Sequence, residues 1–226
     1  MKKTLTLILI LTVTLVSAQE KLQSIVSVTG EGTVKIIPDQ VTIRMSVENS
    51  GDDPVALKTV NDRAVNDVLN FIKQNGVEPK DVQTQHVTLN KRYDYNTKTY
   101  SYQATQTITV LLRDLKKYDG LISGLMTKGI NRIDGITFGT SKLEELKSEA
   151  RKLAVANAKV KAVEYAGVLN QTVGKAIQIN EQGSQAPPMP FYRAEAMAFS
   201  ADGGGETLAV GEMEVKATIQ VVFELK

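Results

Sequence analysis

The sequence predicts an α+β protein made of two βαββ units, with a largely antiparallel sheet, two long helices and one short linking helix. Three observations predict it. Apolar residues alternate with polar ones at period two in several segments, as in strands with one buried face. Elsewhere they recur at steps of three and four, as in amphipathic helices. The order strand, helix, hairpin also occurs twice along the chain, which is typical of helices covering an antiparallel sheet.

The first strands are expected within residues 24–50. Thr29–Gly32 contains two glycines between apolar stretches, and we interpret it as a turn because glycine is common in turns. Pro38 and Asp39 then separate this region from a second strand. That strand alternates four apolar residues with polar ones and should bury one face; the apolar residues are Val41, Ile43, Met45 and Val47.

A long helix should follow, beginning at Pro54. Asp52 or Asp53 can cap it, and proline suits the first helical position. The helix should end at Asn75-Gly76, because glycine readily adopts the left-handed conformation found after helices. The expected buried face repeats at helical spacing and comprises Leu57, Val60, Ala64, Val68 and Ile72.

Two long strands, 82–93 and 100–112, then form a predicted hairpin around the loop 96–99. A four-residue turn at this loop would place Tyr93 opposite Tyr102, Tyr95 opposite Tyr100, and Val87 opposite Ile108. Aromatic side chains would therefore stack across the strands near the hairpin tip. Exposed aromatic residues are common in interfaces, so four tyrosines are candidate contact residues: Tyr93, Tyr95, Tyr100 and Tyr102.

A short helix capped by Asp114 and ended by Gly129 should lead into a strand at 130–140. The expected buried face of this short helix is Leu115, Tyr118, Ile122 and Leu125. Ser141 and Glu144 have the spacing of a capping box for a second long helix, which should end at Gly167.

An alanine stands at every fourth position of this second long helix, and we interpret the row as a close-packing face rather than as helix propensity alone. The row is Ala150, Ala154, Ala158, Ala162 and Ala166. Strands at 173–180 and 212–225 should complete the chain.

An apolar insertion, expected to be flexible, spans residues 184–211 between these last two strands. Three of the six prolines of the chain lie in 187–190, and an apolar segment follows. Loops of this length are usually functional or disordered, and exposed apolar segments mark interaction sites. The candidate oligomer or ligand contacts here are Met189, Phe191, Tyr192, Met197 and Phe199.

The two repeats are expected to cover about 24–113 and 130–226 within one domain, 19–226. Their last strands align by pattern, with Thr107-Ile108 matching Thr218-Ile219. The arrangement of the two halves, as one continuous sheet or as two lobes, stays open.

Residues 1–18 are typical of a secretory signal peptide. A positive start is followed by an apolar run from Leu5 to Val16 and by small residues up to Ala18. The run is shorter than the roughly 20 apolar residues that span a bilayer. We therefore expect a periplasmic or secreted bacterial protein.

Composition excludes several classes of site. The chain has 226 residues, no Cys and one His, so it cannot form a disulfide framework, a thiol nucleophile or a multi-His metal site. It has 27 basic and 25 acidic residues, and removal of the two signal-peptide lysines makes these numbers equal. A neutral protein lacks the basic surface of a nucleic-acid binder. His86 has no partner motif for catalysis, and no cofactor, metal or catalytic residue is predicted.

Several motifs in order resemble the SIMPL family. They are Val26–Val34 with Pro38–Val41, the helix motif Ala150–Ala154, the insertion 187–199, and the closing Gly211–Val215. The resemblance implies an exported bacterial protein. The family that it resembles includes a branch linked to oxidative-stress defence and a member resembling a ring-like or channel-like homo-oligomer.

From these observations we expect a non-enzymatic exported protein that self-associates and contributes to cell-envelope homeostasis or stress protection. The alternative is a periplasmic binding module for a small apolar ligand, a lipid or a peptide, with contact at a membrane surface included. A third reading is an enzyme with a site built from Asp, Glu, Lys and Tyr. Subunit number, channel formation and ligand identity stay open.

Overall fold

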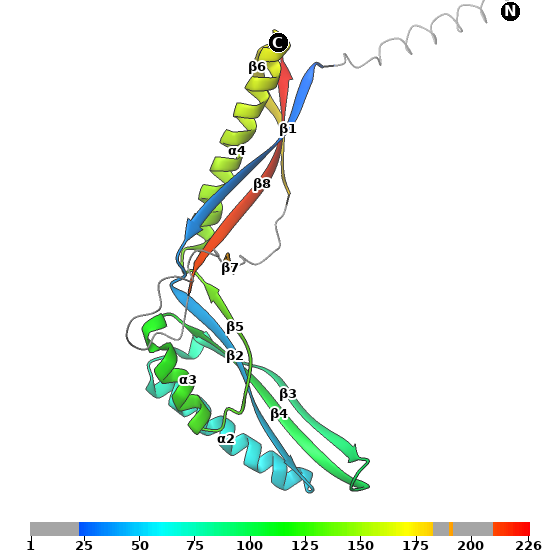
Figure 1. Cartoon of the computed structure of the whole chain (residues 1–226), viewed down its shortest axis with the longest axis vertical. Coiled ribbons are helices and arrows are strands. Elements are labelled where there is room, and N and C mark those ends of the chain that lie inside the picture. The colour runs from blue at the N-terminus through cyan, green and yellow to red at the C-terminus, as the bar shows by residue number, and fades with distance from the viewer. Residues whose placement is uncertain (1–22, 183–189, 192–209) are drawn as a thin grey trace, which may run out of the picture. The chain divides into compact units, whose positions relative to one another are not determined.

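The computed structural model describes residues 23–182, 190–191 and 210–226, and it confirms the predicted mixture of helices and antiparallel sheets (Figure 1). The predicted signal peptide lies outside these residues. The elements are β1 (Ile25–Ile36), β2 (Gln40–Gly51), α2 (Pro54–Gln74), η1 (Pro79–Asp81), β3 (Val82–Asp94), β4 (Thr99–Leu112), η2 (Leu115–Lys117), α3 (Tyr118–Thr127), β5 (Arg132–Gly139), α4 (Leu143–Val168), β6 (Val173–Gln182), β7 (Pro190–Phe191) and β8 (Glu212–Leu225).

The described chain forms two compact units. The α4 unit comprises residues 23–32, 150–182 and 217–226, and the α2 unit comprises 33–149, 190–191 and 210–216. The strands β1 and β8 each contribute residues to both units.

In the α2 unit, four strands pair in the order β3-β4-β2-β5, and α2 and α3 pack on one face of this sheet (Figure 1). The register places Ile43 opposite Val110 and Met45 opposite Ile108. These four side chains are fully buried. The predicted alternation in β2 is therefore confirmed, because every second residue faces the helices.

The predicted caps of α2 are confirmed. Asp53 is the residue that caps it, accepting the N–H groups of Val55 at 2.8 Å and Ala56 at 2.7 Å. Gly76 follows the helix with φ +79°. Glycine has no Cβ, so it adopts this left-handed conformation without strain.

The buried face of α2 differs in part from the prediction. Val60 is 54% exposed, whereas Asn61 and Val65 are buried. Asn61 donates from Nδ2 to the Val47 carbonyl oxygen at 3.2 Å and to Asn49 Oδ1 at 2.9 Å. These bonds satisfy a polar side chain in the core, which hydrophobic spacing alone does not reveal.

The predicted start and end signals of the short linking helix are both confirmed. Asp114 accepts the N–H of Lys116 at 3.1 Å and caps η2, which continues into α3. Gly129 follows α3 with φ +120°. The buried face of α3 is Tyr118, Leu121 and Leu125, so Leu121 takes the place predicted for Ile122.

In the α4 unit, the alanine row packs against the sheet formed by β1, β8 and β6. All five alanines are at most 1% exposed, which confirms the close-packing interpretation. The predicted turn at Thr29–Gly32 is wrong, because β1 continues through it as a strand. A Cβ on Gly30 would collide with the Ala154 carbonyl oxygen and lie 2.6 Å from the Ala158 nitrogen. The glycines therefore permit close approach of strand and helix.

The two sheets combine strands from different parts of the repeat pattern. β5 begins the second predicted repeat, yet it pairs with β2 of the first repeat, with Ile43 opposite Ile136. The N-terminal strand β1 pairs instead with β8. The order β6-β8-β1 thus resembles β3-β4-β2, with β1 supplying the third strand.

The start and end of α4 also differ from the prediction. Ser141, expected to cap the helix, donates its N–H and its hydroxyl to the Asp39 carboxylate at 2.7 and 2.5 Å. The Thr140 hydroxyl oxygen accepts the N–H of Lys142 at 3.2 Å. At the other end Asn170, not Gly167, adopts the left-handed conformation, with φ +54°.

Candidate functional site

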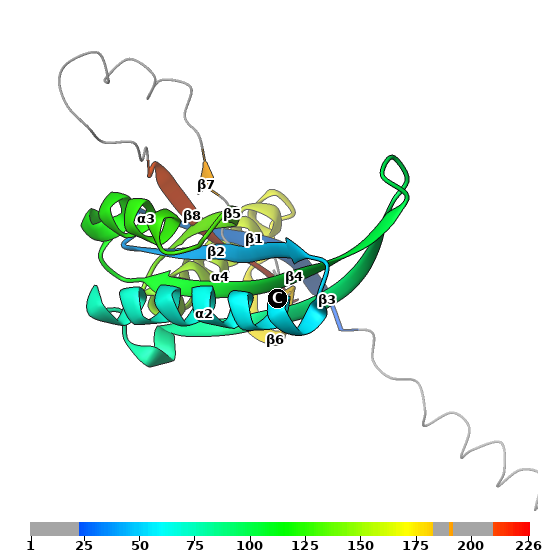
Figure 2. The ribbon, with the colours of Figure 1, turned by 90° about the horizontal axis from the view of Figure 1, so that it is seen from below.

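The first candidate site is the hairpin of β3 and β4, which curves away from α2 and α3 (Figures 1 and 2). Its tip is a four-residue turn over residues 95–98. Asp94 Oδ1 accepts the N–H of Asn96 at 2.8 Å and that of Thr97 at 3.3 Å. Lys98 completes the turn in the left-handed region, with φ +54°.

The turn begins one residue earlier than predicted, so the predicted pairs are wrong. Tyr93 lies opposite Tyr100, and Lys91 lies opposite Tyr102. The same register makes Val87 face Gln106 rather than Ile108, and a bulge between Thr84 and His86 then places Thr84 opposite Ile108. The Asp94 side chain fixes the turn position, a local hydrogen-bonding effect that strand patterning does not show.

The predicted stacking of tyrosines at the tip is nonetheless present. The Tyr93 ring lies 5.1 Å from Tyr95 in an edge-on arrangement and 4.9 Å from Tyr100 in a tilted one. The Lys91 ammonium lies 4.1 Å from the centre of the Tyr100 ring and 6.0 Å from that of Tyr102, a cation–π geometry. Three of the four predicted tyrosines thus form one cluster, and Lys91 links it to Tyr102.

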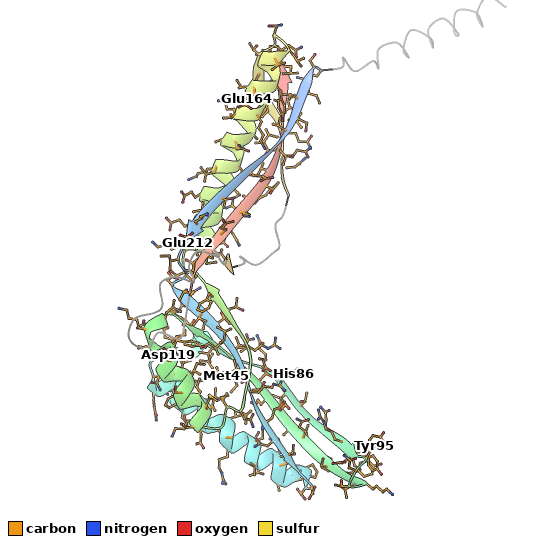
Figure 3. All side chains as sticks on the ribbon, viewed as in Figure 1. Met45, His86, Tyr95, Asp119, Glu164 and Glu212 are labelled. Atoms are coloured by element: carbon orange, nitrogen blue, oxygen red, sulfur yellow. The ribbon has the colours of Figure 1, made fainter. Side chains whose placement is uncertain are left out.

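This aromatic cluster is open to solvent. Tyr95 is 84% exposed, Tyr100 is 58% exposed and Tyr93 is 40% exposed, and Figure 3 labels Tyr95 at the hairpin tip. Val87 and Leu89 of β3 are also exposed, and they alternate onto the same sheet face as Tyr93. The hairpin therefore presents an exposed strip of apolar and aromatic side chains, interrupted by Lys91, which we call the hairpin strip.

The second group of predicted contacts lies largely beyond the described chain. Phe191 belongs to β7, where it pairs with Glu212 of β8. The other members of this group lie outside the described residues: Met189, Tyr192, Met197 and Phe199.

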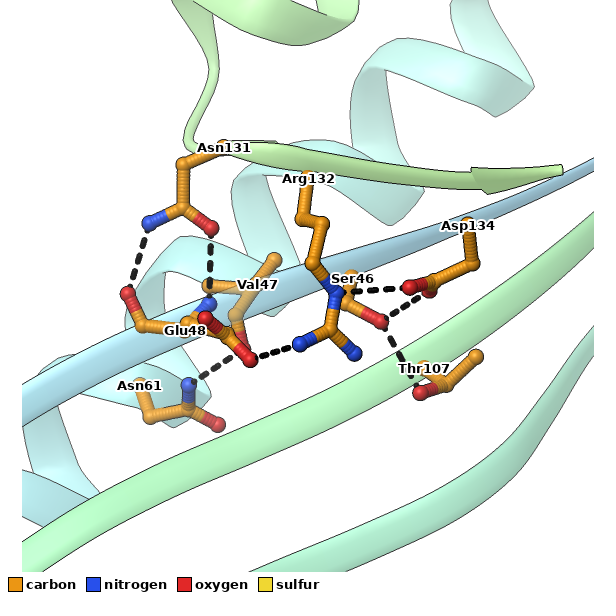
Figure 4. A network of polar contacts seen from close by, with 8 residues as sticks. All are labelled: Ser46, Val47, Glu48, Asn61, Thr107, Asn131, Arg132 and Asp134. Atoms are coloured by element: carbon orange, nitrogen blue, oxygen red, sulfur yellow. Dashed lines mark hydrogen bonds and ion pairs between the residues drawn. The ribbon is translucent and has the colours of Figure 1, made fainter.

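A second cluster, which sequence reasoning missed, is a polar network on the sheet face opposite the helices (Figure 4). The Ser46 hydroxyl is fully buried and donates to Asp134 Oδ2 at 2.5 Å. Thr107 Oγ1 lies 2.9 Å from Ser46 Oγ and must donate to it, because Ser46 has one proton to give. Arg132 Nε donates to the other Asp134 oxygen at 2.6 Å.

The network extends along β2 through Glu48. Its side chain pairs with Arg132, while its backbone N–H donates to Asn131 Oδ1 at 2.9 Å and its carbonyl oxygen accepts from Asn131 Nδ2 at 2.6 Å (Figure 4). A bulge in β5 leaves Asp134 without a strand partner in β2, since Arg44 faces Gly135 and Met45 faces Ile133. The bulge places the carboxylate against Ser46.

The hydrogen bonds of this polar network suit a structural role, holding neighbouring strands together, better than a catalytic one. Burial raises the pKa of Asp134, but hydrogen bonds from Ser46 and Arg132 and the charge of Arg132 outweigh it, so the pKa lies below its ordinary value. A carboxylate held ionised in this way is a weak base. Ser46 is also inaccessible to a substrate. The network therefore joins β2, β4 and β5.

A shallow pocket in the α2 unit lies near the end of α2 and has a charged lining. Arg113 donates two hydrogen bonds to the Asp81 carboxylate, from Nε and Nη2, each 2.7 Å long. These bonds lower the pKa of Asp81 below its ordinary value. Glu78, Asp114 and Lys117 add further charge. Val77, Leu111 and Leu112 give the lining an apolar part as well.

Within residues 23–182, 190–191 and 210–226, no cluster of three or more His, Asp or Glu side chains has a metal-binding arrangement. His86 lies on β3 opposite Thr107, on the sheet face away from the core (Figure 3). None of the helices described in the chain is long and apolar enough to cross a bilayer.

A family model described as "SIMPL: Protein of unknown function (DUF541)" matches residues 26–223. The chain belongs to the SIMPL family. This confirms the resemblance seen in its motifs, all of which lie within the matched region.

Three relatives of this SIMPL protein are identical to it at more than a quarter of the aligned positions. The 26 kDa periplasmic immunogenic protein of Brucella melitensis is 29% identical over 211 residues, covering 89% of this chain and 84% of the relative. The uncharacterized protein YggE of Edwardsiella ictaluri is 28% identical over 202 residues, covering 87% and 84%. YggE of Escherichia coli K12 is 28% identical over 203 residues, covering 87% and 81%.

Proposed function

We propose that this SIMPL protein is exported, self-associates without catalysing a reaction, and contributes to cell-envelope homeostasis or stress protection. The observation that carries the proposal is the hairpin strip. It places three clustered tyrosines and two aliphatic residues in solvent, in an arrangement typical of interface cores. The partner of this strip is a second copy of the chain.

The hairpin strip suits a protein interface for two reasons. Its tyrosines are held by ring contacts and by Lys91, so less conformational entropy is lost when a partner binds. Tyrosine also combines an apolar ring with a hydroxyl that can bond across an interface. The apolar segment within 184–211 would add further contacts, through Met189, Phe191, Tyr192, Met197 and Phe199.

The ionised carboxylates support a non-catalytic function. The pKa values of Asp39, Asp81 and Asp134 lie below their ordinary values because each accepts hydrogen bonds from a hydroxyl or a guanidinium group. A general acid at neutral pH needs the opposite shift. The relatives YggE and the 26 kDa protein are likewise not named as enzymes.

Two observations support the periplasm as the location. The Brucella relative is named a periplasmic protein, and residues 1–18 have the pattern of a secretory signal peptide. Mass spectrometry of protein recovered from the periplasm should give an N-terminus at Gln19. Recovery of the uncleaved chain from the cytoplasm would contradict export.

Sedimentation analysis of mature protein tests the hairpin strip as an interface. The triple variant Tyr93→Ser, Tyr95→Ser, Tyr100→Ser should have a lower assembly mass than the unchanged protein. Tyr165→Ser is the matched control, because it removes an exposed tyrosine from α4 instead. Equal assembly masses for the triple variant and the control would overturn the assignment, provided that circular dichroism shows both to be folded.

A further inference from the structure

The outward face of α4 carries a second exposed apolar surface. Helical geometry of about 100° per residue places most of it opposite the buried alanine row, while Leu153 borders β1 at Gly32. Leu153 is 45% exposed, Val160 is 55% exposed and Val163 is 52% exposed. With two small residues these side chains form what we call the α4 stripe: Leu153, Ala156, Val160, Val163 and Gly167.

The α4 stripe has the spacing of a coiled-coil seam. Leu153, Val160 and Gly167 are seven residues apart, and Ala156 and Val163 occupy the intermediate positions at steps of three and four. Two heptads on one helix can face the same stripe of another helix. The small side chains of Ala156 and Gly167 allow the two backbones to approach closely.

The charges beside the α4 stripe specify the direction of a partner helix. Lys152 and Lys159 lie on one flank, and Glu164 lies on the other (Figure 3 labels Glu164). In a parallel pair, Lys159 of each helix lies beside Glu164 of the partner subunit, in the g-to-e relationship of coiled coils. In an antiparallel pair, the lysine flank would face the partner's lysine flank, so Lys159 would have no glutamate opposite it. The pattern is complementary only for parallel copies.

We propose that the α4 stripe is an interface at which α4 of a second copy of this chain packs in parallel and in register. This inference rests on the proposed self-association and names a surface for it that is separate from the hairpin strip. Lys159 of each copy pairs with Glu164 of the partner subunit across the edges of the seam. Two different interfaces on one chain allow assemblies larger than a dimer.

Single cysteines test this proposal, because the natural chain has none. In a parallel pair, residue 153 faces residue 153, and residue 167 faces residue 167. Leu153→Cys and Gly167→Cys should therefore each form disulfide-linked dimers under mild oxidation, since a disulfide needs Cα atoms roughly 4.4–6.8 Å apart. Asp67→Cys, at an exposed position on α2, is the control and should not. Cross-linking of Leu153→Cys only when mixed with Gly167→Cys would overturn the parallel arrangement.

Charge reversal tests the pairing itself. Lys159→Glu and Glu164→Lys should each raise the dissociation constant of the α4 contact by about tenfold, because both edge pairs become repulsive. An equimolar mixture of the two variants should recover the affinity, since both edge pairs of the mixed dimer then join opposite charges. No loss in either single variant, or no recovery in the mixture, would overturn the proposal.

The two proposals fail in different ways. Loss of assembly mass in the hairpin triple variant, without cross-linking at residues 153 and 167, would overturn the α4 interface and leave the proposed function standing. A monomeric unchanged protein at every concentration would overturn both.

Discussion

Gly30 of β1 lies directly beneath the backbone of Ala158 in α4: a Cβ on this glycine would be 2.6 Å from the Ala158 nitrogen. Gly32 stands in the same relation to Ala154, also at 2.6 Å. The glycine pair and the alanine row are therefore two halves of one close contact between strand and helix.

Alanine at either glycine should destabilise the protein. Gly30→Ala and Gly32→Ala should each lower the free energy of unfolding by about 1–3 kcal/mol, the usual cost of forcing extra atoms into a packed site. Urea denaturation measures this. Gly120→Ala is the control, because nothing lies within 4 Å of its added Cβ. A helix gains from this change, so the control should be neutral or stabilising. An unchanged midpoint for Gly30→Ala would contradict the close contact.

Removing the negative charge of Asp134 should weaken the polar network. Asp134→Asn cannot accept from both Ser46 and Arg132 as an ionised carboxylate does, and bonds to charged groups contribute about 1.5–3 kcal/mol. Chemical denaturation at pH 7 should show a loss of that order. A loss similar to that of the exposed control Asp67→Asn would show that the network contributes nothing.

The same carboxylate should make stability depend on pH. Its pKa is lower in the folded state than the ordinary value of 3.8, so its contribution is fully present above about pH 5. That contribution is lost as the pH falls below 3.8 toward the folded pKa. The stability difference between the natural protein and Asp134→Asn should therefore shrink as the pH falls from about 5 to below 3.8. A difference that stays constant over this range would contradict an ionised Asp134.

Replacing Lys98 in the hairpin turn by glycine should stabilise the protein. Its φ of +54° is costly for a residue with a Cβ, whereas glycine adopts it freely. Lys98→Gly should raise the free energy of unfolding by about 0.5 kcal/mol, and Lys98→Ala should not raise it. Thermal melts of the two variants compare the effects. Greater stability for the alanine variant would argue against the turn at residues 95–98.

Local signals in the sequence predicted much of the fold. Asp53, Pro54 and Gly76 defined α2, since capping and left-handed backbone depend on adjacent residues. The alternation in β8 predicted its bounds, Glu212–Leu225. Tertiary contacts decided the rest. Gly30 and Gly32 resemble turn residues until the helix that they contact is known.

The candidate site was predicted by residue type but not by register. The tyrosines cluster as expected, yet Asp94 moves the turn and changes every cross-strand pair. The polar network escaped prediction because Ser46, Thr107 and Asp134 are distant in sequence and meet only through strand pairing and a bulge.

The most direct test of self-association is the molar mass of the mature chain, residues 19–226, measured by light scattering over a wide concentration range. We expect a mass of several protomers for the natural protein and a smaller mass for a variant lacking residues 186–205. A monomer mass for both proteins at every concentration would contradict self-association.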